Sequence, residues 1–190
     1  FLYNSKSIRA FESKDVLKLI KPILEFSGIK YIGQNIKYDA LILKRNGIDL
    51  SNIFFDTMIA ESLISPEKNS YKLDNLSKDY LNYEMVPIED LIGEKSNQVT
   101  MDTVPLNDIC FYACEDADVV FQLYEIQSKI LKEKKLEKLF YNVEIPLIKV
   151  LVEIEYNGVY VDKSIVDSLC KDLETELEFL RTKIYEISKK

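Results

Sequence analysis

Hydrophobic and polar positions along the chain alternate between short apolar runs and longer stretches with a period of about 3.6 residues. The short runs are typical of strands and lie at 29–33 and 53–55, with a strand end expected at 1–3. The periodic stretches predict helices at residues 15–26, 36–46, 57–64, 72–81, 87–92, 107–132, 136–156 and 164–188. This alternation predicts an α/β fold.

Two polar residues and two glycines mark where helices begin and end. Ser13 and Asp56 each precede a predicted helix and carry a side-chain oxygen that can cap its first turn. Gly28 and Gly47 each follow a helix, where a residue without Cβ ends the last turn easily. We also expect a polar loop over 94–103 and a short strand at 159–161.

The chain changes character near residue 140, and the pattern predicts two domains, 1–140 and 141–190. The lysine-rich segment 132–135 before this boundary is typical of a solvated helix face. The second segment contains helices but too little surface to close a core by itself, so we expect it to be incomplete.

Composition narrows the chemistry that the chain can support. Its 190 residues include 25 Lys and Arg, 32 Asp and Glu and no His, which gives a formal charge of −7. Without His, Ser-His-Asp and Cys-His nucleophilic schemes and His-containing zinc sites are excluded. The 5 glycines are too dispersed for a phosphate-binding loop. Catalysis would therefore use carboxylates, Tyr, Lys, thiols or a bound metal, and carboxylate-held Mg²⁺ or Mn²⁺ is the remaining metal class.

No apolar run approaches the roughly 18 residues that a membrane span needs, and no signal-peptide pattern opens the chain. The cysteines Cys110, Cys114 and Cys170 form no even-numbered disulfide framework. We therefore expect a soluble protein without a membrane partner, in a reducing compartment such as the cytoplasm.

One carboxylate lies on the apolar face of the longest predicted helix. On a helical wheel, Asp116 falls in the middle of an apolar arc, and Tyr112 lies beside it one turn earlier. The opposite, polar side carries Glu115, Asp118 and Gln122. A buried carboxylate without a partner is neutralised or finds a cation. Asp116 is therefore either a metal ligand or one half of a core salt bridge.

A second carboxylate, Asp39, lies on the apolar side of the 36–46 helix. It is either a second inward ligand or a charge that the helix dipole favours near the helix start. Two inward carboxylates on separate helices suit a two-metal phosphoryl site, where the ions lower the pKa of a water and stabilise the attacking and leaving oxygens. A Tyr beside one of them could orient that water.

Other candidates have simpler interpretations. Asp56 is expected to cap the helix that follows it and not to bind a metal. Cys110 and Cys114 are spaced by one helical turn but have no partners for a zinc site, so we expect them to fill space in the core.

Three blocks of sequence stand out together. They are Gly33-Gln34-Asn35-Ile36-Lys37-Tyr38-Asp39, Phe55-Asp56-Thr57-Met58 and Tyr112-Ala113-Cys114-Glu115-Asp116-Ala117-Asp118. In this order they resemble the 3′→5′ exonuclease domain of bacterial family A DNA polymerases. Asp39 matches the metal-binding Asp of that domain's second motif, and Tyr112 and Asp116 match the Tyr-x-x-x-Asp of its third. Residues 143–159 resemble the segment that leads into the polymerase thumb.

The resemblance implies a ribonuclease-H-like fold, in which a mixed sheet is flanked by helices, followed by a helical thumb segment. It implies removal of 3′-terminal nucleotides from single-stranded DNA by two-metal-ion hydrolysis with Mg²⁺ or Mn²⁺. Asp39, Tyr112 and Asp116 are then catalytic, and Asp39 and Asp116 bind the metal.

The resemblance also implies partners. Gln34, Asn35 and Tyr38 match positions near the bound DNA strand. Ile88 stands where the family often has an aromatic residue that contacts a terminal base. The expected partners are DNA, as a single-stranded 3′ end or a primer-template, and the rest of the polymerase chain. We expect a monomer that acts at the nucleoid of a bacterial cytoplasm.

One part of the family pattern is missing. The first motif, an Asp-x-Glu on the first strand, does not occur between Phe1 and Tyr38. We therefore expect the chain to begin after that motif, to lack the first strands, and to be inactive by itself with half of a metal site. The alternative is a catalytically inactive domain that serves as a DNA-binding scaffold for an attached polymerase. A stand-alone exonuclease of the ribonuclease D type is disfavoured by the thumb-like residues 143–162.

Overall fold

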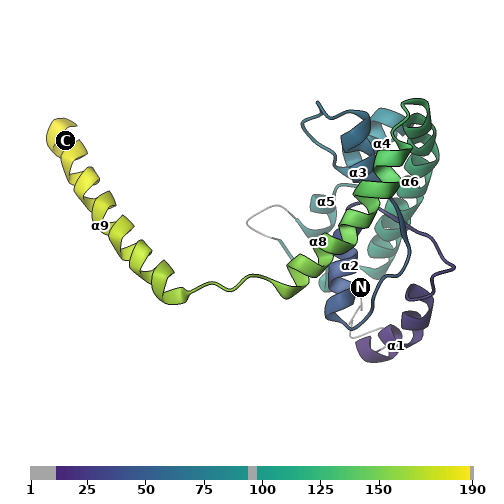
Figure 1. Cartoon of the computed structure of the whole chain (residues 1–190), viewed down its shortest axis with the longest axis horizontal. Coiled ribbons are helices and arrows are strands. Elements are labelled where there is room, and N and C mark those ends of the chain that lie inside the picture. Colours follow the sequence, from purple (N-terminus) through teal and green to yellow (C-terminus); the bar gives the residue numbers. More distant parts are fainter. Residues whose placement is uncertain (1–11, 94–97, 189–190) are drawn as a thin grey trace. The chain divides into compact units, whose positions relative to one another are not determined.

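The computed structural model of the protein describes residues 12–93 and 98–188 (Figure 1). The chain divides into two compact units between Tyr156 and Asn157. The first unit contains a small sheet and most of the helices, and the second contains one helix, α9 (Lys163–Ser188). No helix of the described ranges is both long enough and apolar enough to cross a membrane.

The first unit alternates helices with two strands, as the hydrophobic pattern predicts. Its elements are α1 (Ser13–Leu24), β1 (Tyr31–Gly33), α2 (Ile36–Arg45), β2 (Ile53–Asp56), α3 (Thr57–Ile64), α4 (Leu73–Leu81), α5 (Ile88–Ile92), η1 (Met101–Thr103), α6 (Leu106–Glu133), α7 (Glu137–Leu139), η2 (Phe140–Glu144) and α8 (Ile145–Asn157). Each predicted helix within the described ranges occurs, with ends that differ by a few residues.

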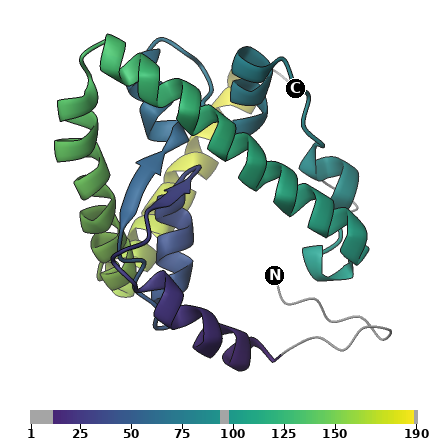
Figure 2. The ribbon, with the colours of Figure 1, turned by 90° about the vertical axis from the view of Figure 1, so that its right-hand side faces the viewer.

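The two strands lie side by side and run in parallel (Figure 2). Tyr31 pairs with Ile53 and Gly33 with Asp56, and the register is irregular between Tyr31 and Ile32. Parallel strands need a crossover, and α2 supplies it here. In the described part of the chain no third strand pairs with β1 or β2, so each strand keeps one open edge.

The main core lies where the sheet meets the helices α2, α3, α6 and α8. Phe55 of β2 is completely buried at its centre, and its ring centroid lies 4.9 Å from that of Tyr124 and 4.7 Å from that of Phe140. The other buried members of this core are Ile36, Ala40, Leu41, Leu50, Ile53, Ala60, Ile64, Leu131, Ile145, Ile148 and Val152. A smaller cluster attaches α4 to α6 and consists of Leu76, Met85, Val119 and Leu123.

Helix α8 belongs to the first unit because its apolar face enters the main core. Charged pairs add to this contact, since Lys37 and Lys44 of α2 bind Glu155 and Glu153 of α8. The compact unit therefore extends to Tyr156, beyond the boundary predicted near residue 140.

Several local expectations differ from the structure. Residues 159–161 form no strand. Ser13 is already the first residue of α1, and the residue before it makes no side-chain cap bond. The helical stretch 136–156 is interrupted by the π-helical turn η2, which ends just before Pro146. Proline has no N–H for the α-helical bond, so a wider turn at this place is expected. The predicted strand end at 1–3 and loop residues 94–97 lie outside the described residues.

Helix α6 buries most of the apolar arc predicted for it, including Ile109, Val119, Val120 and Leu123, but two expectations on this helix are wrong. Glu115, expected on the polar side, is only 8% exposed. Cys110 and Cys114 are exposed free thiols, so the prediction that they fill the core is wrong. Glu115 is buried on the side where α4 packs against α6, and the Tyr83 hydroxyl and the Val86 amide donate hydrogen bonds to its carboxylate.

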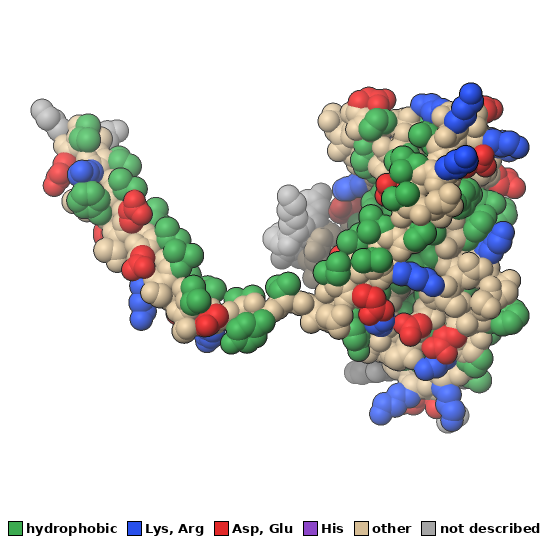
Figure 3. All heavy atoms as spheres, in the orientation of Figure 1, with side chains coloured by type: hydrophobic (Ala, Val, Ile, Leu, Met, Phe, Trp, Pro, Cys, Tyr) green, Lys and Arg blue, Asp and Glu red, His purple; other side chains and the backbone are tan. Residues whose placement is uncertain are grey.

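The second unit carries an amphipathic helix. In α9 the apolar side chains recur every three or four residues, and Figure 3 shows them repeated along the helix. The larger exposed members of this face are Val166, Leu169, Leu173, Leu177, Leu180 and Ile184.

Candidate active site

The ends of both strands are organised by Asp56, which is completely buried. Its Oδ2 accepts a hydrogen bond from the Ile36 amide at 2.7 Å, and its Oδ1 accepts from the amides of Met58 at 2.9 Å and Ile59 at 3.1 Å. One carboxylate thus caps α2 and α3 together, which confirms the predicted cap. Burial raises the pKa of Asp56, and the amide bonds oppose that rise.

Because Asp56 caps α2, the side chain of Asn35 is not needed as the cap of this helix. Asn35 precedes α2 with a left-handed backbone, φ 54°, and its side chain makes no cap bond. That side chain instead lines a hollow beside the strand ends. The tight turn from β1 into α2 therefore brings polar side chains to the carboxyl end of the sheet.

Two adjoining hollows of about 520 and 560 Å³ open at this end of the sheet. They share Gln34, Leu73, Asp74, Tyr112 and Asp116, so we treat them as two parts of one feature, the strand-end cavity. The first part also contains Asp39, and the second also contains Asn35, Ile88 and Glu89.

The three residues predicted to be catalytic line the first part of this cavity. Tyr112 and Asp116 come from successive turns of α6, and Asp39 comes from the first turn of α2. The helical wheel places Asp39 on the buried face of its helix, but this prediction is wrong. Asp39 lies on the exposed side of α2 and lines the cavity. The buried face of α2 consists of Ile36, Ala40 and Leu41.

The cavity shifts the titration of all three groups. Burial raises the pKa of Asp116 to about 6, with further contributions from the charges of Glu115 and Asp74. Burial also raises the pKa of Asp39, which a backbone hydrogen bond opposes and the charge of Asp56 increases. The pKa of Tyr112 is raised by burial and by Asp116. At neutral pH, Tyr112 is therefore a protonated phenol that can donate a hydrogen bond.

We expect Asp116→Asn to stabilise the chain in the absence of divalent cations. The raised pKa means that the charged carboxylate opposes folding above about pH 6, and that this penalty disappears as the pH falls toward the unfolded value of 3.8. Because solvent screens part of the charge, we expect a gain of about 1 kcal/mol, or about 2–4 °C in Tm. Thermal unfolding at pH 7.5 and pH 4.5 measures the gain, which should shrink at the lower pH. Equal gains at both pH values would contradict the assignment.

Asp74, which sequence analysis missed, lines both parts of the cavity. It lies in the first turn of α4, where a carboxylate is expected anyway because it favours the helix dipole. No spacing rule connects this turn with α6, so only the three-dimensional structure brings Asp74 beside Tyr112 and Asp116.

The residues predicted to contact DNA separate into three kinds. Asn35 and Ile88 line the second part of the cavity, and Ile88 is 40% exposed there. The Gln34 amide is occupied by the protein, since its Nε2 donates to the Tyr71 carbonyl at 2.8 Å and its Oε1 accepts from the Thr57 hydroxyl. Tyr38 is exposed on α2 and lines neither part.

The described residues do not form a metal site by themselves. Within 12–93 and 98–188, no group of three or more His, Cys, Asp or Glu side chains is placed to hold an ion. Mg²⁺ prefers six oxygen ligands in near-octahedral geometry. Asp39 and Asp116 would therefore need further protein ligands to hold such an ion firmly.

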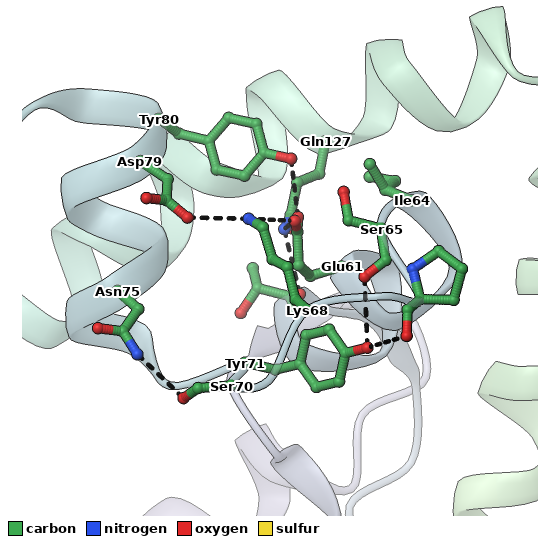
Figure 4. A network of polar contacts seen from close by, with 12 residues as sticks. Glu61, Ile64, Ser65, Lys68, Ser70, Tyr71, Asn75, Asp79, Tyr80 and Gln127 are labelled. Carbon is green, nitrogen blue, oxygen red and sulfur yellow. Dashed lines mark hydrogen bonds and ion pairs between the residues drawn. The ribbon is translucent and has the colours of Figure 1, made fainter.

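A buried ionic network supports the segment that leads into Asp74 (Figure 4). Lys68 Nζ lies 2.6 Å from Oε1 of the buried Glu61 and 2.9 Å from Oδ2 of Asp79. The other Glu61 oxygen accepts from the Tyr80 hydroxyl at 2.8 Å and from Gln127 Nε2 at 3.1 Å. Burial of Tyr80 and its bond to Glu61 raise the pKa of the phenol to about 12. The network joins α3, the following loop, α4 and α6.

Comparison with known proteins places this geometry in context. Residues 4–142 match the sequence profile of a protein family described as 3′-5′ exonuclease. The chain is 40% identical over 158 residues to DNA polymerase I of Borreliella burgdorferi, an alignment that covers 83% of this chain and 17% of that protein. It is 33% identical over 172 residues to DNA polymerase I of Rhizobium leguminosarum, covering 90% of this chain and 17% of that protein.

A solved structure is similar over almost the whole chain. It is described as the POL domain of Pol1 from M. smegmatis in complex with DNA primer-template and dNTP. The TM-score is 0.66 at 20% identity, and the alignment covers 98% of this chain and 29% of that chain. At this identity the similarity concerns the fold alone.

Proposed function

The chain belongs to the 3′-5′ exonuclease family found in bacterial DNA polymerase I, and from that premise we propose that it is the proofreading segment of such a polymerase. The proposed reaction is hydrolytic removal of the 3′-terminal nucleotide of single-stranded DNA. The observation that carries the proposal is that Asp39, Tyr112 and Asp116 line one cavity. Loss of nucleotide release on Asp116→Ala, in the longer protein, tests it.

We further propose that the fold is ribonuclease-H-like and is completed by strands from the longer protein. The two-stranded sheet of the described residues supports this, because a sheet of two strands is marginal on its own. The relatives are several times longer than the chain, which spans 17% of each of the two polymerases described above. Residues 1–140 would form the exonuclease domain and 141–190 the start of the thumb.

In the proposed reaction, the chain's own side chains bind and orient the substrate. The protonated Tyr112 hydroxyl is placed to donate a hydrogen bond to the attacking water or to the terminal phosphate. Asp39 and Asp116 are the proposed ligands of Mg²⁺ or Mn²⁺, together with an Asp-x-Glu proposed for the longer protein. Such ions, once bound, activate water and stabilise developing negative charge.

The proposed DNA contacts are revised by the geometry. Asn35 and Ile88 are proposed to touch the 3′ end within the second part of the cavity. Gln34 is proposed to act indirectly, by fixing Tyr71 in the lining of the cavity. Tyr38 is proposed to contact the DNA strand outside the cavity. The formal charge of −7 does not exclude this, because local basic residues and bound cations govern binding of a short strand. The proposed setting is a monomeric polymerase in the bacterial cytoplasm at the nucleoid.

We expect Tyr112→Phe to slow nucleotide release by the longer protein about tenfold or more, because it removes the hydroxyl that orients water or phosphate. Among the described residues no partner binds this hydroxyl, so Tm should stay nearly unchanged. Release from a 5′-labelled oligonucleotide and thermal unfolding measure the two effects. Tyr160→Phe, at a tyrosine that is 91% exposed, is the control. A change in Tm without a change in rate would make Tyr112 a structural residue.

One observation favours a second candidate function, that of a catalytically inactive DNA-binding scaffold. The described residues bring together too few ligands for a metal ion. The sequence upstream of Phe1 in the longer protein separates the two candidates, because an Asp-x-Glu on a strand supports the nuclease and its absence supports the scaffold.

A further inference from the structure

We propose that Glu115 is a positioning residue for the substrate, because its buried carboxylate fixes the wall of the strand-end cavity that receives the 3′ end. The inference rests on the proposed function for the identity of the substrate. It assigns a role to a residue that the wheel places on the solvent side of α6.

The carboxylate of Glu115 uses both of its oxygens to hold one connection. The Tyr83 hydroxyl donates to Oε1 at 2.6 Å, and the Val86 amide donates to Oε2 at 3.0 Å. Both donors lie in residues 82–87, which join α4 to α5. Glu115 is only 8% exposed and Tyr83 is 42% exposed, so both bonds are partly buried, and both have a charged acceptor, which strengthens them.

The connection that Glu115 holds forms part of the lining of the strand-end cavity, which we call the wall. Met85 and Val86, then Ile88 and Glu89 of α5, line its second part. Val86 is therefore both bonded to Glu115 and exposed to the cavity.

The position of Glu115 in α6 relates the cavity wall to the proposed catalytic residue Asp116. Glu115 is the residue immediately before Asp116, and the side chain of Asp116 faces the same hollow as the wall. One turn of α6 thus carries both Asp116, a proposed catalytic carboxylate, and Glu115, which is bonded to Val86 in the wall. The distance between the wall and Asp116 is fixed by a single rigid element, which is what binding of a nucleotide in a defined orientation requires.

Other contacts hold the beginning and the middle of this connection, where Met85 packs with Leu76 and Val119. The Ser77 hydroxyl donates to the Tyr83 carbonyl at 2.9 Å, and the Tyr83 amide donates to the Ser77 carbonyl at 3.4 Å. Of the hydrogen bonds between described residues, the one to Glu115 is what holds the Val86 amide. We therefore expect the connection to loosen at Val86 when Glu115 is truncated.

The test compares Glu115→Ala, Glu115→Gln and Tyr83→Phe in the 190-residue chain. Glutamine removes the charge but can still accept from the Val86 amide and donate to the Tyr83 hydroxyl, so it should preserve the wall. The matched control for Val86 exchange is Tyr80→Phe, which removes the same kind of bond to another buried carboxylate, Glu61 (Figure 4). Two quantities are measured: hydrogen exchange of the Val86 amide, and the Kd for a 5′-fluorescein-labelled oligothymidylate with a free 3′ end.

We expect Glu115→Ala to speed exchange of the Val86 amide about tenfold or more. We expect the same variant to raise the Kd about fivefold. Tyr83→Phe should also speed exchange and raise the Kd, but by smaller factors. Glu115→Gln should leave both quantities within about twofold of the original, and Tyr80→Phe should leave the exchange of the Val86 amide within the same limit. Rescue by glutamine distinguishes a positioning role from an effect of charge on Asp116.

Two results would overturn the inference. The first is unchanged exchange of the Val86 amide in Glu115→Ala. The second is a Kd that rises equally in the alanine and glutamine variants, which would make the effect one of charge. If Glu115→Ala does not fold, Tyr83→Phe against Tyr80→Phe decides the question. If the unmodified chain does not bind the oligonucleotide, Val86 exchange alone still decides whether Glu115 holds the wall. The proposed function is decided separately, by Asp116→Ala in the longer protein.

Discussion

The 190-residue chain is expected to release little or no nucleotide from a labelled single-stranded oligonucleotide, even in millimolar Mg²⁺ or Mn²⁺. Asp39 and Asp116 supply too few oxygens for two ions, which a two-metal site holds about 3.5–4 Å apart. An ion held by so few carboxylates keeps most of its waters and binds weakly. The proposed site is therefore chemically incomplete, although its cavity is formed.

Joining the chain to an upstream segment that carries Asp-x-Glu should raise the rate of release about 100-fold or more. Asp116→Ala in the joined protein should return the rate to that of the chain alone. The control is Asp118→Ala, which changes a carboxylate two residues away that lines neither part of the strand-end cavity. Robust release by the unjoined chain that depends on Asp116 would mean that other carboxylates complete the site. Absence of release from the joined protein would favour the scaffold.

Much of the first unit could be predicted because its helices bury one continuous apolar face. A period near the helical one locates α2, α3 and α6, and Asp56 is recognisable as a cap from its place between a strand and a helix. The convergence of Asp39 with Tyr112 and Asp116 is also accessible to sequence reasoning. The sequence motifs identify the three residues. The turn into α2 begins at the carboxyl end of β1, which places Asp39 near that end of the sheet.

What could not be predicted depends on partners far away in sequence. A helical wheel assigns Glu115 to the polar side, but two donors from the 82–87 connection make its burial favourable. The same limitation hides Asp74, whose neighbours in the cavity belong to another helix. The extent of the first unit is a third case, because α8 looks like the start of a new segment until its apolar face is seen in the core around Phe55.

The second large effect is expected at the network around Glu61. Lys68→Met should lower the free energy of unfolding by about 2–3 kcal/mol, because it leaves a fully buried carboxylate without its cation. We place the cost below that of a completely buried pair because the Lys68 side chain is 27% exposed. Burial lowers the pKa of Lys68, but its bonds to Glu61 and Asp79 outweigh this and raise it, so the ammonium is charged throughout the neutral range.

The double variant Lys68→Met with Glu61→Gln should recover most of that loss, because a neutral amide can keep bonds to Tyr80 and Gln127 without an unpaired charge. Urea unfolding followed by near-ultraviolet circular dichroism measures the free energies. The control is Lys78→Met, which breaks an exposed pair with Glu84 and should leave stability unchanged. A double variant as unstable as Lys68→Met would show that Lys68 acts through packing of its alkyl chain. Recovery would show instead that the unpaired charge of Glu61 is what destabilises Lys68→Met.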